Sequence, residues 1–302
     1  MHGGVTRKPS PGSRNFEQYQ PGEALKIEAK LKSRMNSRAA SQAAAVSYSD
    51  LRAPSALLLA LETRAPWEFG ATLAAWPLLR AAPEGDGHSV LFFPGLAAPD
   101  VTTWPLRNYL GSRGYECHGW DLGFNFGPRA GVLEQCVERF RKLRKESGRK
   151  LSLVGWSLGG LYAREIAKMF ERDVRCVVTL GTPFTGTPKA TNAWRLYQFA
   201  SGHKLDDHAL LEAVRKPPKV PTTSILSRTD GVVSWQCSLE RETRIAENIE
   251  VVASHVGLGL HPAVLYAVAD HLAQPEGAWR KFSREGWRQW IYRDPHRDAA
   301  QY

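Results

Sequence analysis

The sequence predicts an α/β fold in which helices cover both faces of a mostly parallel central sheet. From residue 89 onward, short apolar runs of strand length alternate with longer segments whose apolar residues recur with helical periodicity. Connections of this kind are right-handed crossovers, and they place successive strands side by side in parallel. Such sheets are buried on both faces, and their functional sites lie beyond the carboxyl ends of the strands.

The first predicted strand, residues 89–93, is a short apolar run that stops at Pro94-Gly95. The predicted strands cover residues 89–93, 116–120, 150–154, 174–180, 220–226 and 249–252. The helices between them have apolar residues on one side and polar residues on the other. The predicted helices cover residues 103–113, 131–146, 158–170 and 262–272. This order places the candidate functional motifs directly after strands, at one rim of the sheet.

The composition changes along the chain and divides it into regions. Residues 1–49 are polar and basic and predict a flexible arm, and residues 276–302 predict a basic tail. Residues 50–82 predict an apolar helical segment that packs on the core or rests on a membrane surface. Residues 83–275 hold the α/β domain. Within it, residues 189–218 have an apolar and a polar side, so they are a candidate lid, with a plain connecting helix as the alternative.

The composition suits a globular enzyme of 302 residues, because 43% of them are hydrophobic and 23% are charged. The net charge of +10 favours anionic surfaces in general. Much of the excess positive charge lies outside the predicted core, and solvated faces and a flexible arm explain it there. No groove motif of interleaved aromatic and basic residues is present, so we expect no nucleic-acid partner.

The compartment is predicted from the cysteines and from the absence of an apolar leader. The four cysteines lie far apart with neither a C-x-x-C pair nor a metal-binding spacing, which predicts reduced thiols and a cytoplasmic protein. The first 45 residues contain no apolar stretch typical of a secretion signal. Residues 57–79 are apolar, but Glu62, Arg64, Pro66 and Glu68 interrupt them, so they do not predict a membrane span. Peripheral contact with a membrane surface is the alternative.

Residues 155–159 read Gly-Trp-Ser-Leu-Gly between a predicted strand and a predicted helix. A turn this sharp strains the serine backbone and needs small residues two positions before and after it. It also places the serine at a helix N-terminus, which favours negative charge. The G-x-S-x-G pattern alone is weak, but its strand–turn–helix context predicts that Ser157 is a nucleophile. The alternative is an ordinary glycine-rich turn.

A serine that attacks a carbonyl needs two donors for the oxygen that becomes charged. The backbone N–H of Leu158, directly after the serine, is one candidate. The other is the N–H of Leu96 in the loop after the strand at 89–93, where Gly95 lets the backbone approach closely. A plain Pro-Gly turn is the alternative interpretation of this loop.

Asp230 is the candidate acid, because it follows the strand at 220–226 and therefore lies at the same rim as Ser157. Asp206 and Asp207 are rivals in a polar segment before that strand, and Asp-Gly is also a common turn.

His255 is the candidate base, because it lies in a glycine-containing loop after the strand at 249–252 and follows Asp230 in the chain. His261 precedes Pro262 and fits the start of a helix better. His271 lies on the closing helix, and His296 lies in the tail.

Together these motifs resemble the α/β-hydrolase superfamily, and within it the bacterial lipase-like members, over roughly residues 89–272. Residues 181–186, Gly-Thr-Pro-Phe-Thr-Gly, are similar to the Gly-Thr-Pro segment of triacylglycerol lipases and of inositol deacylases. The Ser-His-x-Gly loop at 254–257 is similar to the histidine loop of the same group. One departure is Pro94 where the family often has histidine, and another is Ala98 in place of a second glycine.

The resemblance implies an α/β-hydrolase fold and a serine hydrolase that cleaves small-molecule or lipid esters through an acyl-enzyme. It implies no metal or organic cofactor. Two alternatives remain open: an acyltransferase that uses the same triad, and a non-catalytic binding protein. The candidate residues of the substrate pocket are Gly95, Asn125, Trp156, Phe184 and Trp235.

Overall fold

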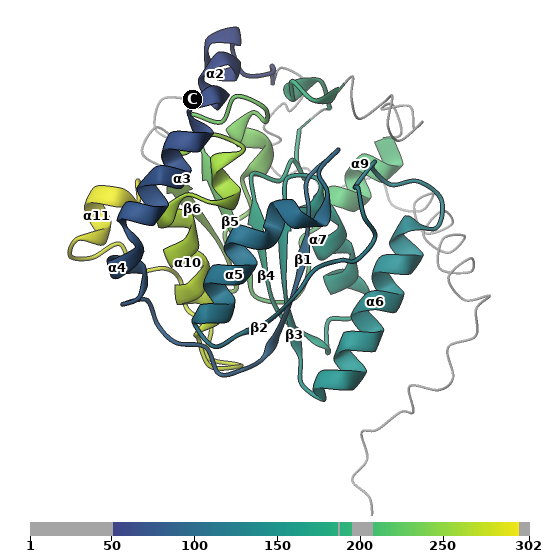
Figure 1. Ribbon diagram of the computed structural model, residues 1–302. Helices are drawn as coiled ribbons and strands as arrows, with labels where there is room; N and C mark the ends of the chain where they lie inside the picture. Colours follow the sequence, from purple (N-terminus) through teal and green to yellow (C-terminus); the bar gives the residue numbers. More distant parts are fainter. Residues whose placement is uncertain (1–50, 187, 195–207, 296–302) are drawn as a thin grey trace, which may run out of the picture. The chain divides into compact units, whose positions relative to one another are not determined.

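The core of this computed structural model is one six-stranded sheet in the order β2-β1-β3-β4-β5-β6, with every neighbouring pair parallel (Figure 1). The structure describes residues 51–186, 188–194 and 208–295. The strands are β1 (Ser89–Phe93), β2 (Glu116–His118), β3 (Leu151–Trp156), β4 (Val174–Leu180), β5 (Thr222–Ser227) and β6 (Ala246–Val251). This arrangement confirms the predicted α/β fold with a mostly parallel sheet.

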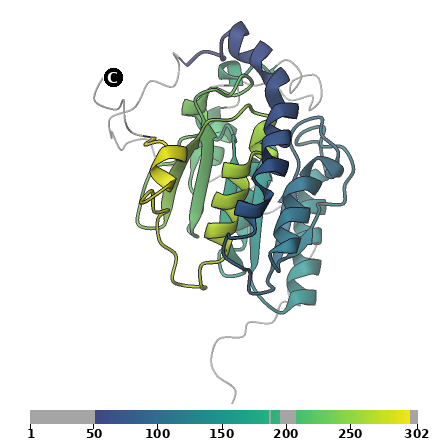
Figure 2. The ribbon, with the colours of Figure 1, turned by 60° about the vertical axis from the view of Figure 1, so that its left-hand side comes forward.

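Helices cover the two faces of the sheet, and each face has its own apolar core (Figure 2). On one face, α5 (Trp104–Ser112) and α10 (Pro262–Leu272) pack on Val90, Phe92 and Val154. On the other, α6 (Val132–Ser147) and α7 (Gly159–Met169) pack on Leu91, Phe93 and Leu153. Alternate residues of β1 and β3 therefore point to opposite cores, as the two-residue period of a strand requires.

The edge strand β6 begins three residues before its predicted start, because its polar side chains have partners outside the strand. Asn248 exchanges two hydrogen bonds with the backbone of Glu240, each 2.8 Å long. Glu250 pairs with Arg228 at 3.1 Å. The predicted strand at 249–252 therefore started three residues too late, and it ended one residue too late.

The segment before β1 forms a series of short helices that lies beside α10 on one face of the sheet (Figure 2). They are α2 (Ala56–Ala60), η3 (Leu61–Arg64), α3 (Ala65–Ala74) and α4 (Trp76–Leu79). Leu79 and Ala65 are buried, whereas Leu57, Trp67 and Leu78 are exposed. Among the helices that the structure describes, none has the length and apolar character needed to cross a bilayer.

Two shorter helices complete the described chain: α9 (His208–Arg215) before β5 and α11 (Arg288–Ile291) after α10. The candidate lid at 189–218 remains a prediction, because residues 195–207 lie outside the described part of the chain. The predicted arm at 1–49 and the end of the predicted tail at 296–302 lie outside it as well.

A chain of polar side chains, with buried His88 at its centre and exposed Asp86 at one end, links the start of β1 to β3. The ring of His88 lies 2.5 Å from the carboxylate of Asp86 through Nδ1 and 2.8 Å from the hydroxyl of Ser152 through Nε2. Arg175 also donates to Asp86, at 2.7 Å. Burial is the largest influence on His88, and it lowers the pKa of the ring despite the opposing effect of Asp86.

We expect His88 to make the stability of the protein sensitive to acid. Below the ordinary histidine pKa of about 6.5 the unfolded chain binds a proton that the folded ring resists, so stability is complete above this pH and falls below it. We expect His88→Gln to lose less unfolding free energy between pH 8 and pH 5 than the wild type does, measured by urea denaturation. His118→Gln, on β2, is the control. Equal losses in the wild type and His88→Gln would contradict this assignment.

Candidate active site

Ser157 lies in a strained turn between β3 and α7. Its φ is +53°, in the left-handed region that non-glycine residues rarely adopt. A Cβ on Gly155 would overlap Cα of Gly160, and one on Gly159 would overlap the carbonyl oxygen of Phe93. Glycine is therefore required two residues before and after Ser157, because the helix starts directly against β3 and the end of β1.

The structure brings Ser157, His255 and Asp230 together at the carboxyl rim of the sheet. Nε2 of His255 lies 2.9 Å from Oγ of Ser157, and Nδ1 lies 2.6 Å from Oδ2 of Asp230. The three residues follow β3, β6 and β5, so parallel pairing places them at the same rim. The geometry is that of a nucleophile, a base and an orienting acid.

The carboxylate of Asp230 is fixed at both oxygens. Oδ1 accepts hydrogen bonds from the N–H groups of Val232, at 2.8 Å, and Val233, at 2.7 Å. Oδ2 is thereby aimed at the imidazole, and the side chain is buried. An acceptor in this position keeps the proton of neutral His255 on Nδ1 and leaves Nε2 free to accept one from the serine.

The electrostatic surroundings of His255 favour its protonated form. Burial opposes the charge, but the negative charge and hydrogen bond of Asp230, with the charge of Glu62, outweigh it and raise the pKa of the imidazole above its ordinary value. The ring can therefore take up a proton readily, as a general base must.

The rival residues occupy other positions. His261 caps the N-terminus of α10 and accepts a hydrogen bond from the N–H of Ala263 at 3.2 Å. His271 is buried on α10 with Nε2 2.6 Å from Oε1 of Glu247. Asp206, Asp207 and His296 lie outside the described residues.

The loop that carries Leu96 passes directly in front of the serine, and a Cβ on Gly95 would lie 3.4 Å from Cβ of Ser157. Within the described residues, neither the N–H of Leu96 nor that of Leu158 donates to another protein atom. Both amides are therefore free to bind a ligand oxygen, as the candidate oxyanion hole requires.

Comparison with known proteins agrees with this geometry. The profile of the alpha/beta hydrolase family matches residues 90–298. The chain belongs to the α/β hydrolase family. No curated protein matches it.

Solved structures with the same fold include Aspergillus fumigatus lipase B, at 19% identity and a TM-score of 0.50. That match covers 66% of this hydrolase and 58% of the lipase. Bacillus licheniformis lipase BlEst2 in its propeptide form matches at 16% identity and a TM-score of 0.50, over 67% of this chain and 53% of the lipase. At such identities the likeness concerns the fold alone, and this hydrolase spans little more than half the length of each lipase.

Asn125 holds the loop in front of Ser157 in this hydrolase. Its side-chain amide donates to the carbonyl of Pro94 at 2.7 Å, and its backbone exchanges hydrogen bonds with Ala97 and Ala98 at 2.7 and 3.1 Å. Its own oxygen accepts from the N–H of Gly127 at 3.1 Å. The sequence singled out Asn125 as a pocket residue, and the structure shows its amide bonded to the loop backbone.

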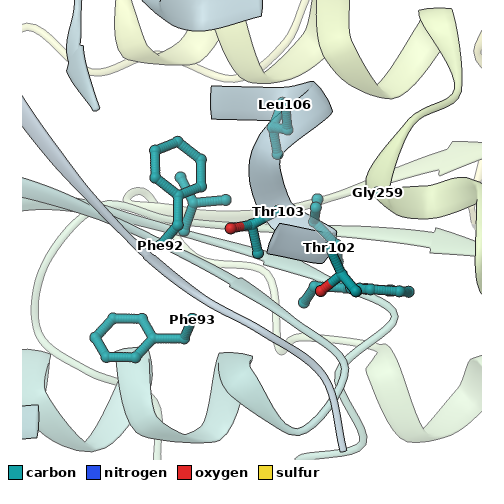
Figure 3. A pocket seen from close by; sticks show the side chains of 9 residues that line it. Phe92, Phe93, Thr102, Thr103, Leu106 and Gly259 are labelled. Carbon is teal, nitrogen blue, oxygen red and sulfur yellow. The ribbon is translucent and has the colours of Figure 1, made fainter. Parts of the chain in front are cut away.

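A small cavity lies beside this loop, between the end of β1 and the start of α5 (Figure 3). Its walls are mostly apolar and consist of Phe92, Phe93, Thr102, Thr103, Leu106, Val154, Trp156, Leu180 and Gly259. Of the predicted pocket residues, Trp156 lines it, and the indole N–H of this residue donates to the carbonyl of His255 at 3.0 Å. The sequence did not indicate Thr102 or Leu106, because nothing local ties them to the serine.

Phe184 and Trp235 face cations in the structure. The guanidinium of Arg164 lies 3.9 Å from the centre of the Phe184 ring, and that of Arg228 lies 3.9 Å from the Trp235 ring. Their contact with substrate stays a prediction. In the described part of the chain, no three His, Cys, Asp or Glu side chains are grouped to hold a metal ion.

The sequence also missed contacts from residues 62–72 to the loops of Asp230 and His255. A signal was present, since Glu62, Arg64 and Glu68 interrupt an otherwise apolar stretch. Charges in such a stretch need partners when the stretch packs on a core. The sequence did not show where those partners lie.

Asn125→Ala should reduce turnover because it releases the loop that carries Leu96. We expect kcat for a soluble ester to fall roughly 10- to 100-fold, as for a misplaced catalytic group. Asn248→Ala is the matched control, since Asn248 is also buried and bonded to backbone but lies on β6. If Asn125→Ala and Asn248→Ala reduce kcat equally, the loop has no special role.

Proposed function

We propose that this hydrolase cleaves carboxylic esters, as lipases and esterases do, with Ser157 as nucleophile, His255 as base and Asp230 as the orienting acid. The observation that carries the proposal is the continuous pair of hydrogen bonds from Ser157 through His255 to Asp230. The strained turn at Ser157 and the free N–H groups of Leu96 and Leu158 support it.

In the first half of the reaction, Oγ of Ser157 attacks the ester carbonyl carbon while Nε2 of His255 takes the hydroxyl proton. The carbonyl oxygen becomes negatively charged and accepts hydrogen bonds from Leu96 and Leu158. The tetrahedral intermediate collapses, the bond to the alkoxy oxygen breaks, and His255 returns its proton to the departing alcohol. An acyl ester on Ser157 remains.

In the second half, water replaces the alcohol. His255 takes a proton from the water as its oxygen attacks the acyl carbon, and the same two N–H groups stabilise the new oxyanion. The bond to Oγ breaks, and the proton on His255 passes to Ser157. The products are a carboxylic acid and an alcohol, and the enzyme is unchanged.

The apolar walls of the cavity beside the loop of Leu96 support a substrate class. Phe92 and Leu106 would meet an apolar acyl chain favourably, and no charged side chain lines the cavity. We therefore propose a small-molecule or lipid ester as substrate. The exposed Leu57, Trp67 and Leu78 support peripheral contact with a membrane as part of the same proposal.

A fluorophosphonate probe tests the nucleophile. We expect the full chain to be labelled at Ser157, with the modified residue identified by peptide mass spectrometry, and to hydrolyse p-nitrophenyl esters. Ser157→Ala should lose labelling and lower kcat by roughly 10⁴-fold or more, because the acyl-enzyme can no longer form. A folded wild type that neither reacts with the probe nor cleaves esters of any chain length would refute the proposal.

The pH dependence of hydrolysis tests the base. His255 must be neutral to accept the serine proton, so kcat/KM falls as the pH drops through the raised pKa of the ring. We expect the acid limb above the ordinary histidine value of about 6.5. Asp230→Asn removes the nearest negative charge, so it should move this limb to lower pH. An acid limb well below pH 6.5 in the wild type would contradict the assignment.

A further inference from the structure

Three side chains of the short helices before β1 contact the loops that carry the acid and the base. Glu62 and Arg64 lie on η3, and Glu68 lies on α3. Their partners are 165 to 194 residues further along the chain. These contacts are long-range, and none of the hydrolysis steps uses them.

Glu62 bridges the two loops with one carboxylate. Oε1 accepts from the N–H of Gly231 at 2.7 Å and from the N–H of His255 at 2.9 Å. Oε2 accepts from the N–H of Val256 at 3.1 Å. Glu62 thus binds both Gly231, which follows Asp230, and His255 itself.

Arg64 and Glu68 hold the other sides of the same loops. Nη2 of Arg64 donates to the carbonyl of Thr229 at 2.9 Å and to its hydroxyl at 2.8 Å. Glu68 accepts from the N–H of Ser254 at 2.8 Å and from its hydroxyl at 2.5 Å. Arg64 and Glu68 also pair with each other at 3.0 Å. The residues before and after both Asp230 and His255 are therefore bound to this segment.

Glycines in the two loops leave room for the segment. A Cβ on Gly231 would overlap the carbonyl oxygen of Leu58, and one on Gly257 would overlap Oε2 of Glu68. Neither glycine has a positive φ, so a left-handed backbone does not explain them. In this chain, the segment from residue 58 to residue 68 approaches both positions closely, and this explains why they are glycines.

We propose that η3 and the first turn of α3 form a positioning clamp that holds the acid and base loops in register, with Glu62 as its central residue. The inference rests on the proposed triad. An imidazole on a loop must stay within hydrogen-bond reach of both partners, and a shift of about 1 Å can cost roughly 100-fold in rate. Glu62, Arg64 and Glu68 do not touch the reacting atoms, so they are positioning residues.

The clamp also places negative charge near the base. Asp230 faces Nδ1 of His255, and Glu62 binds its backbone N–H. Arg64 and Glu68 carry opposite charges and pair with each other at 3.0 Å. Burial of the ring is outweighed by Asp230 and Glu62, which raise the pKa of His255. Removing the charge of Glu62 should therefore lower that pKa.

The decisive test measures His255 directly in the full chain. We expect NMR titration of the imidazole to give a lower pKa in Glu62→Gln than in the wild type. Glu138→Gln, which removes the same charge from an exposed position on α6, should leave the pKa unchanged. Amide hydrogen exchange at residues 229–233 and 254–257 should be at least about 10-fold faster in Glu62→Gln, with the strands β3 and β4 unaffected.

Arg64→Ala is the second variant if Glu62→Gln does not fold, and it should speed exchange at Thr229 and its neighbours. If the protein cleaves esters, Glu62→Gln should lower kcat roughly 10-fold with KM nearly constant. Unchanged pKa and unchanged loop exchange in a folded Glu62→Gln protein would overturn the clamp. Neither the pKa of His255 nor loop exchange needs catalytic turnover to be measured. An inactive wild type would therefore refute the proposed function, and these two measurements would still test the clamp.

Discussion

The turn from β3 into α7 is the constraint on which the rest of the site depends. Ser157 takes a left-handed conformation there, and Gly155 and Gly159 let the helix begin against the strand and against the end of β1. A side chain at either glycine would push α7 away from the sheet. With this turn in place, parallel pairing alone sets the ends of β5 and β6, and hence Asp230 and His255, at the same rim.

The chain contains a second Asp–His–Ser series, with similar hydrogen bonds but different surroundings. Asp86, His88 and Ser152 are linked as closely as Asp230, His255 and Ser157. Ser152, however, is fully buried near the start of β3, at the opposite end of the strand from Ser157. It lacks the strained turn, the helix N-terminus and the free N–H groups that surround Ser157.

Elements with strong local signals were predicted at their observed bounds. Pro262 starts α10, Pro94 ends β1, and Gly181 ends β4, so local chemistry fixes these boundaries. Prediction failed for β6, whose polar residues are satisfied by Glu240 and Arg228 from elsewhere in the chain. The prediction for Asn125 was incomplete. The sequence does not distinguish an asparagine whose amide binds its own loop from one whose amide faces a cavity.

The sequence by itself determined the order of the strands along the chain, the turn that carries Ser157 and the candidates Asp230 and His255, because each depends on residues close together along the chain. Only the tertiary structure decided the cavity beside β1, the hydrogen bond between Asn125 and Pro94, and the contacts from Glu62 to the loops of Asp230 and His255. These depend on which surfaces meet after folding. A carboxylate 193 residues before its partner carries no local sign of that partner.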